Sequence, residues 1–82
     1  MEFSLIPLLT LSKGQLATIK LIDDDELSLA LLHLGIKTGD ILRLSNIAPL
    51  GDPIAIAVNG TKISIRKKEA ARIWVLPVDS PQ

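Results

Sequence analysis

The fold of this chain is decided by residues 54–65, which read IAIAVNGTKISI. On both sides of Asn59-Gly60, large apolar residues alternate with small or polar ones, which is the pattern of two β-strands that each bury one face. A two-residue turn of type I′ needs positive φ at both central positions, and Asn-Gly suits it well. With that turn Ile56 faces Ile63, and the large apolar side chains of both strands share one face. The sequence therefore predicts an antiparallel hairpin.

Two more strands are predicted before the hairpin. Apolar residues alternate with polar ones from Ala17 to Leu21, which indicates a strand with one face in the core and one in water. Leu42 and Leu44 alternate with polar neighbours in the same way, and this predicts a strand over 40–47.

Between these strands, the acidic run over 23–26 marks the start of a helix. Asp23 and Glu26 have the spacing of a capping box, and Gly35 stands where a left-handed residue ends a helix, so the helix is predicted over 25–34. Helical periodicity gives it an inward stripe of Leu27, Ala30, Leu31 and Leu34. The same periodicity turns Leu29, Leu32 and His33 outward.

After the hairpin, the sequence predicts a single helical turn over 66–72 and a last strand over 73–76. Pro77 is expected to end that strand because proline has no N–H to donate, which leaves 77–82 as a tail. Trp74 should point away from the core, unless the N-terminal segment folds across it.

The order of these elements predicts a mainly β fold. Residues 1–14 form a lead-in segment, and one domain over 1–82 contains about five antiparallel strands, with one helix after the first strand and a short helical turn before the last. Small antiparallel sheets protect their edges by curling into a barrel, and the helix is expected to cover one open end.

Composition excludes several kinds of function. Lys plus Arg and Asp plus Glu both total 9, so the formal net charge is zero, and Phe3 and Trp74 are the only Phe, Trp or Tyr residues. We expect no nucleic-acid partner, because such partners need net positive charge and often stacking rings. The chain has no cysteine, which removes thiolate metal sites and cysteine nucleophiles. A mean hydropathy of +0.39 indicates that some apolar surface meets a partner.

No segment predicts export or membrane insertion. Residues 3–11 are apolar, but Glu2 precedes them and Pro7 interrupts them, unlike a signal peptide. Residues 27–36 are about half as long as the ~20 residues that a membrane span requires. We therefore predict a cytoplasmic protein.

Five short motifs follow one another along the chain. They are LSKG at 11–14, LLHLGI at 31–36 with Thr38-Gly39, APLGDP at 48–53, IRKKEA at 65–70 and IWV at 73–75. Their order and spacing resemble the FeoA family. The resemblance implies an SH3-like barrel and a cytosolic, non-enzymatic accessory protein of bacterial ferrous iron uptake, with no cofactor. It also implies a partner, the cytosolic GTPase region of the FeoB-type transporter. The protein would be peripheral to the membrane, and only through this partner.

The residues predicted to contact a partner are apolar or basic and lie outside the predicted core. Outward leucines can form a docking surface or a contact between copies of the chain, and basic residues can steer an acidic partner. Single exposed leucines and charge runs are also common on surfaces without a function. The predicted set is Leu29, Leu32, His33, Pro49, Leu50, Arg66 and Lys67.

No catalytic or metal-binding residue is predicted. The single histidine and scattered Ser and Thr residues give no paired nucleophile and base. The acidic run offers oxygen ligands for Fe²⁺, but carboxylates at a helix start also stabilise its free N–H groups. His33 lies ~11 to 12 Å along the helix from Asp25 or Glu26, too far to share an ion.

Two other functions stay open on the sequence. One is a metal-sensing or metal-delivery domain that binds Fe²⁺ weakly, as in the C-terminal domain of DtxR-type regulators, where the same module occurs. The other is a ligand- or peptide-binding SH3-like domain unrelated to iron.

Overall fold

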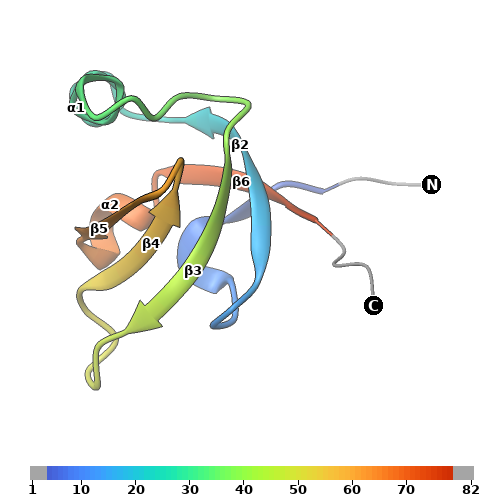
Figure 1. Ribbon diagram of the computed structural model, residues 1–82, viewed down its shortest axis with the longest axis vertical. Coiled ribbons are helices and arrows are strands. Elements are labelled where there is room, and N and C mark those ends of the chain that lie inside the picture. The colour runs from blue at the N-terminus through green and yellow to red at the C-terminus, as the bar shows by residue number, and fades with distance from the viewer. Residues whose placement is uncertain (1–3, 79–82) are drawn as a thin grey trace.

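The computed structural model describes residues 4–78 and contains one antiparallel sheet with the strand order β1-β6-β2-β3-β4-β5 (Figure 1). The fold is mainly β, as predicted, but with six strands in place of about five. In chain order the elements are β1 (Ile6–Pro7), the 3-10 helix η1 (Leu8–Thr10), β2 (Leu16–Ile22), α1 (Asp25–His33), β3 (Ile41–Ile47), β4 (Ile54–Val58), β5 (Thr61–Ile65), α2 (Lys67–Ala70) and β6 (Ile73–Val78).

The hairpin of β4 and β5 is confirmed in its turn and in its register. Asn59 and Gly60 have φ values of 53° and 76°, the left-handed conformation that the turn needs. Ile56 pairs with Ile63, and Ile54 with Ile65, as predicted. The large side chains of β4 are buried, so this hairpin supplies one wall of the core.

The N-terminal segment is part of the sheet, so the prediction of a lead-in segment over 1–14 is wrong. β1 pairs with β6, with Pro7 opposite Trp74, and leaves Trp74 only half-buried. Leu8 and Leu11 follow this strand and are fully buried in the core. Periodicity misses this segment because its strand has only two residues.

The prediction that Pro77 ends the last strand is also wrong. β6 continues to Val78, with Pro77 opposite Ala17 of β2. Among residues 4–78, β1 pairs only with Trp74 and Val75, and beyond these residues no other described strand lies on that side of β6. A proline is tolerated in a strand when its missing N–H lies on such a free side.

A register shift changes which residues of β2 face the core. The pairing of β2 with β6 is irregular between Ile19 and Leu21. Beyond this shift Leu21 is 49% exposed, and Ile22 is buried in its place. The inward position predicted for Leu21 is therefore wrong, because a bulge breaks the alternation of period two.

No polar or charged side chain of the described residues is buried. The core consists of aliphatic side chains from all six strands, η1, α1 and α2, so any function of the described part depends on its surface.

Candidate functional site

The start of α1 is fixed by Asp24, not by Asp23 as the capping-box spacing predicted. Asp24 has extended backbone angles, and its Oδ1 accepts the Leu27 N–H at 3.0 Å. Asp25 and Glu26 lie in the first turn, where negative charge is favourable to the helix dipole. The acidic run therefore starts the helix, as predicted.

The end of α1 turns sharply back to the sheet. Gly35 has a φ of 82°, and its N–H donates to the Leu32 carbonyl at 2.9 Å. The Ile36 N–H donates to the Leu31 carbonyl, also at 2.9 Å, which completes the Schellman pattern. Leu31 and Ile36 are both buried, so the motif fixes where the helix leaves the core.

The loop after α1 is held by the turn of the hairpin. Asn59 Nδ2 donates to the Gly35 carbonyl and to Asp40 Oδ2, each at 3.1 Å. The Lys37 N–H donates to the same Asp40 oxygen at 3.0 Å, and this bond, with lesser help from Asn59 and the Lys37 ammonium, holds the pKa of Asp40 below its usual value.

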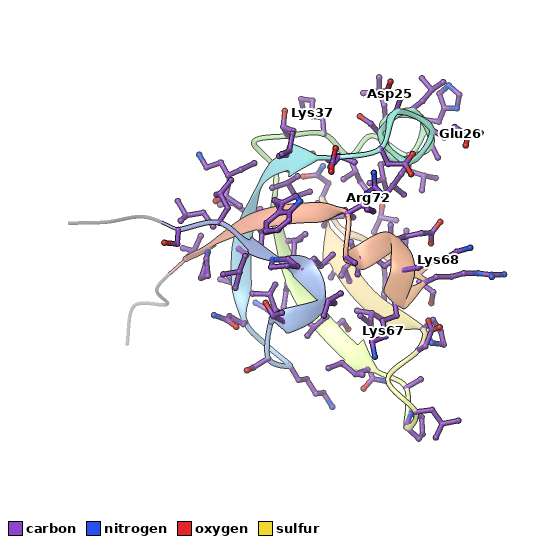
Figure 2. The ribbon with its side chains drawn as sticks, turned by 180° about the vertical axis from the view of Figure 1, so that it is seen from behind. Asp25, Glu26, Lys37, Lys67, Lys68 and Arg72 are labelled. Carbon is purple, nitrogen blue, oxygen red and sulfur yellow. The ribbon has the colours of Figure 1, made fainter. Side chains whose placement is uncertain are left out.

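The other end of α1 is held by Arg72, which precedes β6. Its Nε donates to the Asp23 carbonyl at 2.8 Å, and its Nη2 lies 3.8 Å from Asp23 Oδ2. The Asp23 N–H in turn donates to the Arg72 carbonyl at 2.7 Å. In Figure 2, Arg72 reaches from the start of β6 towards α1. The helix is therefore fastened at both of its ends.

Between these two ends, most of the apolar surface of α1 is exposed. Leu31 is the one α1 residue that is buried, and Leu27 packs against the core as a half-buried residue. Leu29, Leu32 and Leu34 are 55%, 53% and 55% exposed. Leu34 lies just beyond His33, the last residue of α1, whereas Leu29 and Leu32 are three residues apart and share one side of the helix. We call Leu29 and Leu32 the leucine face.

The outward positions predicted for Leu29, Leu32 and His33 are confirmed, since all three are exposed. The inward positions predicted for Ala30 and Leu34 are wrong, since both are exposed. In Figure 1, α1 lies above one end of the strands, and Leu31 is its one buried residue, so most of the helix surface faces solvent.

The predicted partner residues do not form one patch. Leu50 is 94% exposed at the tip of the loop between β3 and β4, beside the exposed Pro49. This loop lies at the opposite end of the longest axis from α1 (Figure 1), and the molecule extends 33 Å along that axis. One small contact cannot include both Leu50 and the leucine face.

Arg66 and Lys67 lie at a third position, the start of α2. The Arg66 N–H donates to Glu69 Oε1 at 2.8 Å, and the Lys67 N–H donates to Asp52 Oδ1 at 2.9 Å. The side chains of Arg66, Lys67 and Lys68 are exposed, and Figure 2 shows Lys67 directed away from α1. The predicted single helical turn is thus confirmed, and its cations are exposed to solvent.

A groove of about 620 Å³ separates α1 from α2, and no sequence pattern indicated it. It is lined by Asp24, Glu26, Leu27, Ala30, Lys68, Glu69 and Arg72. The carboxylates of Asp24 and Glu26 lie on the α1 side, and α2 contributes both a cation, Lys68, and a carboxylate, Glu69. Arg72, which lines the groove, is bonded to Asp23, 49 residues away in sequence, next to the start of α1.

The acidic run does not gather into a metal site. Asp24 caps the helix and Asp23 binds Arg72, so these two carboxylates are engaged separately. Among residues 4–78, no three His, Cys, Asp or Glu side chains lie close enough together to hold a metal ion.

Comparison with known protein families identifies the chain. It matches the FeoA domain over residues 6–77, which is most of its length. The chain belongs to the FeoA family.

Solved structures of FeoA proteins share this fold. The FeoA protein from Chlorobium tepidum is 29% identical, with a TM-score of 0.84, over 94% of this chain and 74% of that one. Iron(II) transport protein A from Clostridium thermocellum is 36% identical, with a TM-score of 0.81, over 89% of this chain and 46% of that one. The predicted resemblance to the FeoA family and its SH3-like fold is therefore confirmed.

The same fold occurs in larger regulators. A manganese-dependent transcriptional repressor has a TM-score of 0.82 at 19% identity, over 95% of this chain and 44% of that one. At this identity the likeness concerns the fold alone. No curated protein matches the chain, and no helix within residues 4–78 is long and apolar enough to cross a membrane.

Proposed function

We propose that this FeoA-family chain is a cytoplasmic, non-enzymatic accessory protein of bacterial ferrous iron uptake. It acts by binding the cytosolic, GTPase-bearing region of a FeoB-type transporter. The observation that carries the proposal is the leucine face of α1, where the two large apolar side chains of Leu29 and Leu32 are each more than half exposed. Apolar side chains gathered on one element are typical of a surface that a partner covers.

The attachment of α1 supports this role. The helix is held at its N-terminal end by Arg72 and at its C-terminal end by Asn59. It therefore keeps its position without burying its outer side, and it presents a rigid apolar ridge that loses little entropy when a partner binds. His33, at the end of the same helix, lies at the rim of this surface.

Binding of this kind regulates through differences in affinity. A protein can shift the conformation of its target only if it binds one state of the target more tightly than another. The proposed regulator would therefore bind the nucleotide-bound and nucleotide-free forms of the GTPase region with different affinities. The basic residues Arg66 and Lys67 would speed encounter with an acidic surface and contribute less to the final affinity.

Titration against the isolated GTPase region and against the full transporter tests the proposal. Covering the exposed half of one leucine is worth about 1 kcal/mol, so the double variant Leu29→Glu with Leu32→Glu should weaken binding by at least about 30-fold. Leu50→Glu is the control, because it places a glutamate at a leucine that is even more exposed, 94% against 55% and 53%, at the other end of the molecule.

If the leucine-face variant binds the transporter with full affinity and Leu50→Glu does not, the binding surface lies on the loop between β3 and β4 instead. Failure of the wild-type protein to bind either form of the transporter would refute the proposed function. The leucine face could instead hold two copies of the chain together. Sedimentation of the free protein measures its oligomeric state, and such a contact would be lost in the same double variant.

A further inference from the structure

The edge strand β5 has an open side. The strand order places β5 at one end of the sheet, and among residues 4–78 it pairs only with β4. The strand at the other end, β1, has only two residues and contains Pro7. With five residues, β5 is therefore the longer of the two sheet edges.

The two-residue turn decides which backbone groups face the open side. In such a hairpin the residues next to the turn exchange hydrogen bonds, so Thr61, Ile63 and Ile65 are bonded to β4. The N–H and C=O groups of Lys62 and Ser64 then point away from β4. Within the described part of the chain, no hydrogen bond joins these groups to another segment, and both side chains are exposed.

Positive charge is concentrated on this edge and on the turn that follows it. Four of the nine Lys and Arg residues fall within 62–68, and all four are exposed: Lys62, Arg66, Lys67 and Lys68. The nearby carboxylates are engaged, since Glu69 and Asp52 accept backbone N–H groups and Asp23 binds Arg72. A hollow of about 510 Å³ lies at α2 and is lined by Leu9, Asp52, Arg66, Lys67, Lys68 and Ala71.

We propose that the open edge of β5 binds an extended, acidic segment of a partner protein, which adds to the sheet as a further strand. Backbone hydrogen bonds to Lys62 and Ser64 supply affinity, and the surrounding cations select acidic side chains. A second copy of this chain fits the edge poorly. If the β5 edges of two copies paired, the cations of one copy would lie beside the same cations of the other and repel them. The site is separate from the leucine face, and the inference does not depend on the transporter.

The test uses the full chain and a peptide of defined sequence. The acidic peptide EVETEVET, acetylated and amidated, is titrated into the ¹⁵N-labelled protein, with KVKTKVKT as the matched control. The acidic peptide should shift the amide resonances of β5 and slow hydrogen exchange of Lys62 and Ser64 by about tenfold or more at saturation. The basic peptide should do neither.

The variant Ser64→Pro removes an outward N–H and no bond to β4, so it should weaken binding of the acidic peptide by about tenfold or more. Ser64→Thr keeps the N–H and should bind like the wild type. If Ser64→Pro fails to fold, EVETEVET with alternate backbone N-methyl groups replaces it and should not bind to the wild type. The proposal would be overturned if EVETEVET left the β5 resonances unchanged, or if KVKTKVKT bound equally well. It would also be overturned if Ser64→Pro bound EVETEVET with full affinity, or if the wild type bound the N-methylated peptide with full affinity.

Discussion

Truncating Leu31 should destabilise the protein far more than truncating Leu29, although both leucines belong to α1. Leu31 is 3% exposed and Leu29 is 55% exposed. A buried Leu→Ala change costs about 2 to 5 kcal/mol, because the lost transfer free energy and the cavity both count. Less than half of Leu29 is buried, so its truncation removes about 1 kcal/mol or less. Helix propensity adds to neither loss, because Ala is at least as good a helix former as Leu.

Urea unfolding followed by the fluorescence of Trp74 measures this difference, because Trp74 is the only tryptophan and is half-buried beside Pro7. A domain of 82 residues has an unfolding free energy of about 4 to 12 kcal/mol. With a slope of about 1 kcal/mol per M, Leu31→Ala should lower the urea midpoint by about 2 M or more, and Leu29→Ala by about 1 M or less. Equal shifts in the two variants would show that α1 packs in another way and would remove the basis for the leucine face.

Three further predictions concern the anchors of α1. The pKa of Asp40 is lowered in the folded state, chiefly by the hydrogen bond from the Lys37 N–H. The ionised Asp40 carboxylate therefore stabilises the fold at pH values above the pKa of an unfolded Asp, about 3.9. This stabilisation is lost as the pH falls through the lowered pKa of the folded state. Asp40→Asn should therefore flatten the fall in urea midpoint between about pH 4 and pH 2 relative to the wild type, and parallel curves would contradict this. Arg72→Lys should lower the free energy of unfolding by about 1 kcal/mol, since lysine does not reproduce the Nε bond to the Asp23 carbonyl; an unchanged urea midpoint would argue against this anchor. Gly35→Ala should cost about 1 to 2 kcal/mol because its φ is 82°, and Gly35→Asn should cost less, as thermal unfolding can check; equal losses would mean that the left-handed conformation is not the cause.

Local sequence determined the elements whose signals lie within a few residues of each other. The turn at Asn59-Gly60 fixed the hairpin and its register, because only left-handed residues close that turn and only one register places all the large side chains on one face. The helix over Asp25–His33 followed from its acidic start and from Gly35 at its end. Outward positions for Leu29, Leu32 and Leu50 followed from helical periodicity and from the turn-forming residues around the loop.

Tertiary structure decided what depends on contacts between distant segments. Arg72 bonds to Asp23 at the start of α1, 49 residues away in sequence, and Leu34 at the other end of the helix is exposed, although periodicity alone had placed it in the core. Pairing of β1 with β6 brought the N-terminal segment into the sheet, although a strand of two residues leaves no periodic signal. The open edge of β5 is likewise a property of strand order, since a strand carries the same local sequence whether or not a neighbour covers its outer side.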